Sequence, residues 1–151
     1  MYCELEAKTN YSFLQGAARP DELMARAAEL GLPALALNDF DGVYGIPKAF
    51  WKQKEMPSVK LISGASLSLP GGERLTLLAR DRAAYGLLCR VLTESHAGKE
   101  KGQACLSWEK LAEMIPPAHG LFALAPLAGS IARLKPLFEG RLYLTLHRLL
   151  D

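Results

Sequence analysis

The sequence has few cysteines, no long hydrophobic run and little net charge, and each shortage excludes a class of protein. Its three cysteines, Cys3, Cys89 and Cys105, are odd in number and widely spaced, so they form neither a disulfide framework nor a CxxC zinc pair. No apolar run approaches the ~20 residues that span a bilayer. A net charge of +2 is too small to indicate nucleic-acid binding by itself. Residues 1–6 lack a basic-then-apolar signal pattern, so we expect a cytoplasmic protein with no membrane partner.

What is present is the composition of an ordinary globular domain. Of the 151 residues, 50% are hydrophobic and 23% are charged, which suffices for a hydrophobic core. Short apolar segments alternate with helical patterns and predict an α/β fold, either a parallel sheet or part of a barrel, in one domain over residues 1–151. Strands are predicted at 2–5, 34–37, 59–62, 66–69, 74–79, 121–124 and 142–146. Helices are predicted at 20–30, 46–54 and 131–138, after the cap Asp81, and from Ser107 onward.

The most informative segment is the predicted strand at 34–37, which leads directly into a loop with two carboxylates, Asp39 and Asp41. Ligands of α/β proteins bind beyond the carboxyl ends of parallel strands, so an active site is expected here. Phe40, however, stands between the two acids, where a metal or acid–base site needs nitrogen or oxygen. The alternative, which we favour, is that the two carboxylates accept backbone N–H groups ahead of Gly42.

Several sequence blocks occur together in an order typical of one known family. They are residues 4–5, 10–17, 20–23, 27–31, 34–45, 64–65, 75–81 with Tyr85, and 141–144. Together they resemble the N-terminal PHP (polymerase and histidinol phosphatase) domain of bacterial C-family DNA polymerases, the polymerase III alpha subunit and, more closely, its error-prone relative. The resemblance runs from Tyr2 to about Arg148. It implies the N-terminal portion of a PHP-type distorted (β/α) barrel, expected here as part of a larger polymerase.

The positions of the family's metal ligands carry other residues in this chain. The resemblance implies His-x-His where the chain has Glu6-Ala7-Lys8, Asp-His where it has Asp39-Phe40, and a glutamate at Ser66. A zinc or manganese site needs several imidazoles or carboxylates that converge, and Lys8 instead brings a positive charge. We therefore expect no catalytic residue and no cofactor. Asp39 and Asp41 are the residual candidates for a weak zinc or manganese site.

Two arrangements of this vestigial site are open on the sequence. In the first, Lys8 pairs with Asp39 or Glu6, so that an ion pair replaces the metal. In the second, Glu6 acts as a substitute ligand with help from Glu4.

The other reactive or large side chains are interpreted as structural. The histidines fall in no ligand motif: His96, His119, His147. Cys89 is expected to pack in the core. Trp51 and Trp108 lie at helical spacing and are expected to anchor packing. Residues 99–101 are expected in a solvated loop. Five basic residues could form a face toward DNA, although their number is ordinary for a protein surface: Arg19, Arg26, Lys48, Lys52, Lys54.

Three functions remain open at this point. The one we favour is a non-catalytic module of an error-prone polymerase, whose partners are the remaining polymerase domains, other polymerase or DNA-repair subunits and, through the parent protein, DNA. The second is a metal-dependent phosphoesterase or proofreading exonuclease with an atypical site, although too few ligands remain for a metal-activated hydroxide. The third is a free-standing interaction protein. An open sheet edge in such a domain would favour pairing with another chain.

Overall fold

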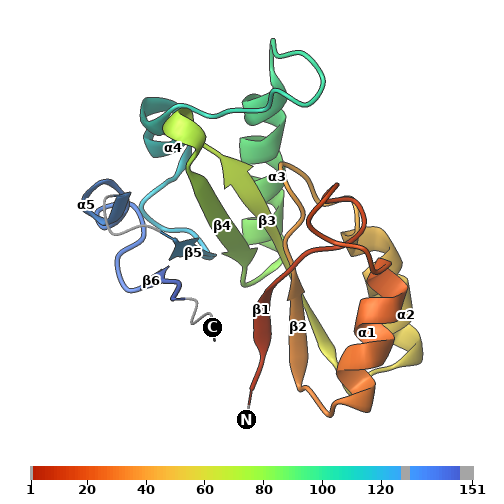
Figure 1. Ribbon diagram of the computed structural model, residues 1–151. Helices are drawn as coiled ribbons and strands as arrows, with labels where there is room; N and C mark the ends of the chain where they lie inside the picture. Colours follow the sequence, from red (N-terminus) through yellow and green to blue (C-terminus); the bar gives the residue numbers. More distant parts are fainter. Residues whose placement is uncertain (1, 127–129, 147–151) are drawn as a thin grey trace.

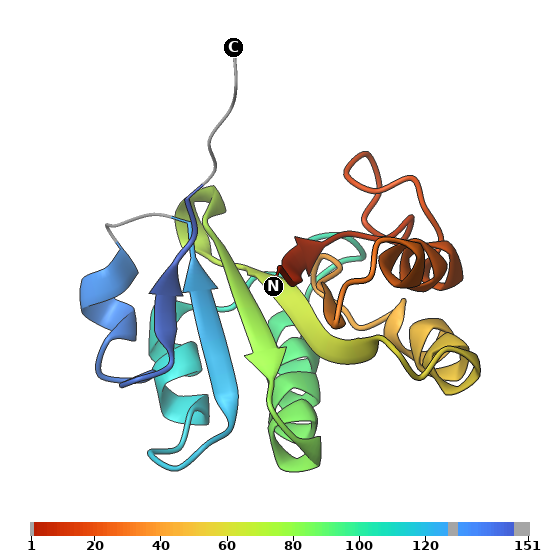
Figure 2. The same cartoon turned by 90° about the horizontal axis from the view of Figure 1, so that it is seen from below.

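The structure is a computed structural model that describes residues 2–126 and 130–146, and a curled six-stranded sheet forms its centre (Figures 1 and 2). The strands lie side by side in the order in which they occur in the chain. They are β1 (Glu4–Ala7), β2 (Ala34–Leu37), β3 (Lys60–Ser68), β4 (Arg74–Ala79), β5 (Leu121–Ala125) and β6 (Leu142–Leu144). The sheet curls like part of a barrel (Figure 2), as the sequence predicts.

The sheet is mixed, so of the two arrangements that the sequence left open, part of a barrel fits and a parallel sheet does not. Strands β1, β2 and β3 pair in parallel, β3 to β5 pair antiparallel, and β5 and β6 are again parallel. The reversal comes from β3, a single nine-residue strand where two were predicted. Its first half pairs with β2 up to Ser63, and its second half pairs with β4 from Gly64 onward. The predicted hairpin between β3 and β4 is confirmed; it turns at residues 70–72, where Gly71 and Gly72 have positive φ.

Gly64 marks the point where β3 changes partners. A Cβ atom at this position would lie 1.9 Å from Asn38 Oδ1 and 2.7 Å from the carbonyl oxygen of Leu77. Only glycine therefore allows the loop after β2 and strand β4 to approach β3 from both sides.

Five α-helices are described: α1 (Pro20–Glu29), α2 (Ile46–Glu55), α3 (Arg82–His96), α4 (Trp108–Met114) and α5 (Ile131–Leu134). Pro20 occupies the first turn of α1, and Gly31 follows its end with φ +67°, as the sequence indicates. The Asp81 side chain accepts the Ala84 N–H (2.9 Å) and caps α3. Helix α5 is shorter than predicted, because Pro136 has no N–H to donate to a preceding turn. No helix among the described residues is both long enough and apolar enough to cross a membrane.

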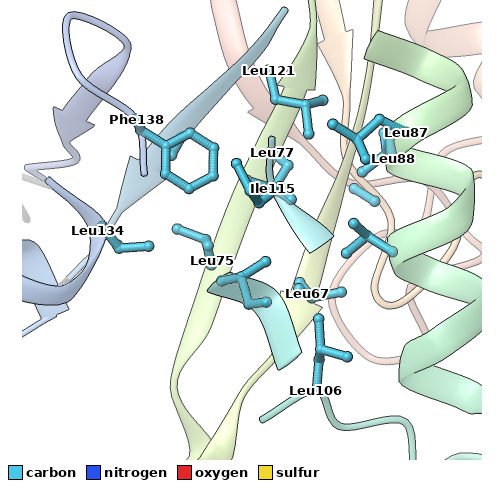
Figure 3. Packing of buried hydrophobic residues seen from close by; sticks show 14 of the residues in the cluster. Leu67, Leu75, Leu77, Leu87, Leu88, Leu106, Ile115, Leu121, Leu134 and Phe138 are labelled. Atoms are coloured by element: carbon cyan, nitrogen blue, oxygen red, sulfur yellow. The ribbon is translucent and has the colours of Figure 1, made fainter. Parts of the chain in front are cut away.

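Two apolar cores lie between the helices and the sheet. The larger joins β3, β4 and β5 to α3, α4 and the segment around Phe138; Leu67, Leu75, Leu77, Leu88 and Leu121 meet there (Figure 3). The smaller lies under α1 and α2, which sit side by side next to β1–β3. Cys89 is half-buried beside Tyr85 rather than in the core.

Side chains of several strands surround a hollow of about 810 Å³ on the sheet. Its lining is mainly apolar and includes Leu5, Ile62, Leu78 and Phe122, together with residues of the last strand and the residues that follow it. On this side, Tyr143 is 54% exposed and Leu146 is 84% exposed. Part of the apolar sheet surface thus has no cover among the described residues.

Candidate functional site

The Asp39 carboxylate lies at the carboxyl end of β2 and is almost completely buried, with 2% exposure. Its Oδ1 accepts hydrogen bonds from the Thr9 N–H (2.9 Å), the Thr9 hydroxyl (2.9 Å) and the Ser12 hydroxyl (2.7 Å). The Thr9 hydroxyl also lies 2.8 Å from Oδ2. Thr9 and Ser12 are themselves buried. The carboxylate therefore fastens the loop that follows β1 to the end of β2.

A chain of polar contacts runs beside Asp39 across three further strands. Lys8, just after β1, donates from Nζ to Ser66 Oγ on β3 (2.6 Å). Ser66 Oγ lies 3.0 Å from Thr76 Oγ1 on β4, and Thr76 Oγ1 donates to Glu6 Oε1 on β1 (3.3 Å). The register of the hairpin places Ser66 directly opposite Thr76. The two ends of this chain of contacts carry opposite charges: the Lys8 ammonium at one end and the Glu6 carboxylate at the other.

Burial dominates the electrostatics of Lys8. It lowers the pKa of the ammonium below its usual value, because the charged form loses solvent; the Glu6 and Asp39 charges oppose this shift and Arg74 adds to it. The Nζ atom also lies 5.4 Å from the centre of the Phe40 ring. The centre of the cluster is therefore occupied by a partly desolvated cation.

Phe40 and Asp41 close the cluster from the side of Arg74. The Arg74 guanidinium lies 3.9 Å from the Phe40 ring centre and 3.3 Å from Asp41 Oδ2. Asp41 also accepts the Ser68 N–H (2.7 Å) and the Ser68 hydroxyl (2.6 Å). Each of the two carboxylates in the loop thus accepts a backbone N–H, although from Thr9 and Ser68 rather than from residues ahead of Gly42.

The fold brings together all the positions that the family resemblance singles out: Glu6, Lys8, Asp39, Phe40, Ser66. Lys8 donates its hydrogen bond to Ser66 and not to Asp39, whose oxygens are taken by Thr9 and Ser12. Glu4 binds its own strand, accepting the Glu6 N–H (2.7 Å) and the Tyr2 hydroxyl (2.6 Å). Among residues 2–126 and 130–146, no three His, Cys, Asp or Glu side chains are grouped closely enough to hold a metal ion.

Sequence reasoning missed four residues of the cluster: Thr9, Ser12, Arg74, Thr76. One of them carried a readable signal, since Thr76 falls opposite Ser66 in the predicted hairpin. Thr9 and Ser12 had none, because they lie in an irregular loop.

The histidines have structural contacts. His96 Nε2 donates to the Asp41 carbonyl (2.6 Å) and joins α3 to the site loop. His119 contacts the Leu137 carbonyl (2.9 Å) and packs edge-on against Phe138. His147 lies outside the described residues. Trp108 packs against the larger core, as predicted, whereas the prediction for Trp51 is wrong, because its side chain is 64% exposed. Residues 99–101 are exposed, as predicted.

Comparison with known proteins gives a family match and similar relatives that agree with each other. Residues 4–149 match the family described as PHP domain. An error-prone DNA polymerase of Anaeromyxobacter dehalogenans is 44% identical over 97% of this chain, and one of Rhodopirellula baltica is 40% identical over 81%. The chain spans only 14% and 10% of the length of these two relatives.

Two solved structures share the fold. An amidohydrolase from Chromobacterium violaceum, with bound sulfate and no metal, superimposes with a TM-score of 0.60 at 17% identity, covering 84% of this chain and 67% of its own. A putative metal-dependent phosphoesterase from Bifidobacterium adolescentis has a TM-score of 0.51 at 19% identity, covering 63% of this chain and 33% of its own. At such identities the likeness concerns the fold alone, and it agrees with a PHP-type distorted barrel.

Proposed function

This chain belongs to the PHP domain family, and from this premise we propose that it is the N-terminal PHP domain of an error-prone C-family DNA polymerase, in which it serves as a structural and interaction module. The relatives that match nearly its whole length carry the name error-prone DNA polymerase. Nucleotide transfer, in replication or damage tolerance, then takes place in parts of the polypeptide beyond this chain. A cytoplasmic location is part of the proposal.

The observation that supports the non-catalytic role is that Asp39 and Ser66 are already engaged in hydrogen bonds within the protein. A zinc or manganese ion does not fit the residues present, because Asp39 already accepts hydrogen bonds from Thr9 and Ser12. Ser66 is engaged with the Lys8 ammonium, which would repel a divalent cation at short range. We infer that a hydrogen-bonded network replaces the metal here.

The network has a mechanical role in this proposal. It links the ends of β1, β2, β3 and β4 through side chains at one end of the sheet. Buried polar networks that are fully satisfied rigidify a unique arrangement. A rigid strand end can present the loops that follow β1 and β2 in fixed positions to neighbouring domains.

The polymerase domains that follow are the first partners we propose. The hollow on the sheet is lined by apolar side chains, and Tyr143 beside it is largely exposed. The relatives are far longer than this chain, so their further polypeptide offers a cover for such a surface. Other polymerase or DNA-repair subunits, and DNA through the parent protein, are further partners in this proposal.

Metal analysis of the purified protein tests the non-catalytic role. We expect zinc and manganese well below one ion per chain and no rise in the unfolding temperature when either metal is added, because a ligand stabilises only the state that binds it. The variant with Glu6→His, Lys8→His, Phe40→His and Ser66→Glu supplies the ligand types that the family resemblance implies at these positions and is the positive control. Stoichiometric metal in the wild-type protein would overturn the proposal. So would phosphatase or exonuclease activity with Mn²⁺ or Zn²⁺ that is lost in Asp39→Ala, in favour of a metal-dependent phosphoesterase.

A further inference from the structure

Helix α2 carries two side-chain stripes, and only one of them faces the core. Ile46 and Ala49 are buried against α1 and the sheet. Phe50 and Trp51 are 49% and 64% exposed, and they share the outer side of the helix with Lys54. Two large aromatic side chains thus leave about half or more of their surface uncovered on one helix face, so a binding role is the natural question.

Aromatic rings and lysines alternate along this outer surface. Lys54 Nζ lies 4.1 Å from the ring centre of Trp51 and 4.8 Å from that of Phe50. Lys48 Nζ lies 5.6 Å from the Tyr11 ring, and the rings of Tyr11 and Tyr44 are 6.2 Å apart. Tyr11 and Tyr44 are 40% and 53% exposed. We call this set the α2 aromatic surface: Tyr11, Tyr44, Lys48, Phe50, Trp51, Lys54.

The two lysines of this surface differ from the other basic residues nearby. Arg19, Arg26 and Lys52 are each paired with a carboxylate close to them in sequence: Asp21, Glu29 and Glu55, respectively. Within residues 2–126 and 130–146, Lys48 and Lys54 make no ion pair, and their contacts are with aromatic rings. Their charges thus remain available to an anionic partner.

We propose that the α2 aromatic surface binds single-stranded nucleic acid, with bases stacked on the rings and phosphates beside Lys48 and Lys54. Sequence-tolerant binding of single strands combines these two elements, stacking platforms and cations that follow the backbone. An apolar protein partner would explain the rings but not the unpaired lysines, and an acidic protein partner would explain the lysines but not the exposed ring faces. The two lysines are six residues apart, about 9 Å along the helix, with Phe50 and Trp51 between them. The proposal requires no metal and does not depend on the polymerase assignment.

Binding of a fluorescent oligothymidine to the purified protein tests this proposal by anisotropy, with a duplex of equal length for comparison. We expect tighter binding of the single strand. Trp51→Ala should weaken it by about fivefold or more, the effect of losing one base–aromatic stack, while Trp51→Phe should retain most of it. In the variant with Lys48→Gln and Lys54→Gln, the slope of log K against log salt should become shallower by about 1.4, the value for two phosphate contacts on a single strand.

Matched controls are available elsewhere on the surface. Lys99→Gln with Lys101→Gln removes the same charge from an exposed loop, and Tyr2→Ala removes an exposed ring that lines the hollow on the sheet and lies outside the α2 aromatic surface. Neither should change binding, and thermal unfolding should show that every variant is folded. Absence of binding at low salt, equal losses in the controls, or equal affinity for duplex would overturn the proposal. Equal competition by an acidic peptide, with no effect of Trp51→Ala, would also overturn it in favour of a protein partner.

Discussion

Replacement of Asp39 is the most direct test of the network at the end of the sheet. Asp39→Ala removes the acceptor for three donors, the Thr9 N–H, the Thr9 hydroxyl and the Ser12 hydroxyl. A hydrogen bond to a charged group contributes about 1.5–3 kcal/mol, and a buried donor left unpaired costs a similar amount. Because the three donors share one carboxylate, their contributions do not add fully. We expect Asp39→Ala to lower the free energy of unfolding by about 3–5 kcal/mol in total.

Asp39→Asn removes the charge of this side chain but keeps its shape, so it separates their contributions to the free energy of unfolding. The amide keeps one oxygen that can accept from Thr9 and Ser12, so the loss should be about 1–2 kcal/mol. In a domain of this size each kcal/mol corresponds to a fall of about 2–4 °C in unfolding temperature.

Guanidinium unfolding followed by circular dichroism, with EDTA present throughout, measures these losses. Asp21→Ala serves as the control, because Asp21 lies on the surface in an exposed ion pair, which contributes about 0–1 kcal/mol. Limited proteolysis should also cut faster within residues 10–16 in Asp39→Ala, since that loop loses its anchor. If Asp39→Ala has wild-type stability in EDTA and differs only when metal is added, the carboxylate is a metal ligand and the reasoning fails.

Two further predictions concern backbone space and pH. Gly64→Ala should destabilise by about 2 kcal/mol or more, since its Cβ would meet Asn38 and Leu77. Gly86→Ala should stabilise the protein by up to about 1 kcal/mol, because Gly86 lies in α3 and the atom nearest to its added Cβ is 3.8 Å away. If the two alanine variants change the free energy of urea unfolding equally, this prediction is contradicted. The folded-state pKa of Lys8 lies below its unfolded value of 10.5, so between the two the unfolded state binds more protons and stability rises with pH. The free energy of unfolding of the wild type, measured relative to that of Lys8→Met, should therefore increase as the pH rises toward 10.5. If the difference between the two free energies does not change with pH, this prediction is refuted.

The parts of the fold that depend on local chemistry could be predicted from the sequence. Strand β2, the Pro20 start of α1 and the Asp81 cap of α3 are set by residues next to one another in the chain. The course of β3 could not be predicted, because the small residues 63–65 look like a break until β2 and β4 are seen on either side. Pairing partners decide whether such a segment ends a strand or continues it, and they are distant in sequence.

The site shows the same division. The sequence shows that Lys8, Phe40 and Ser66 differ from the ligand types that the family resemblance implies, but the donors that bind Asp39 come from an irregular loop with no periodic pattern. The prediction for Trp51 was wrong because α2 has apolar residues at helical spacing on two faces. Periodicity identifies a stripe on a helix, yet it does not say which of two stripes faces the core.

One loop connects the polar network to the α2 aromatic surface. Thr9 Oγ1 donates to Asp39 and accepts the N–H of Tyr11 (3.1 Å), so the backbone that carries the Tyr11 ring is held by the network. At Gly45, which precedes α2, an added Cβ would lie 2.9 Å from Asp39 Oδ2 and 3.0 Å from Thr9 Cγ2. The start of α2 therefore packs directly on the buried carboxylate. Asp39 occupies the position of a metal ligand in the family resemblance, but here its contacts fix the relative positions of a loop and a helix that together form an exposed surface. A structural function for this carboxylate and a binding function for the neighbouring surface are thus compatible consequences of the same contacts.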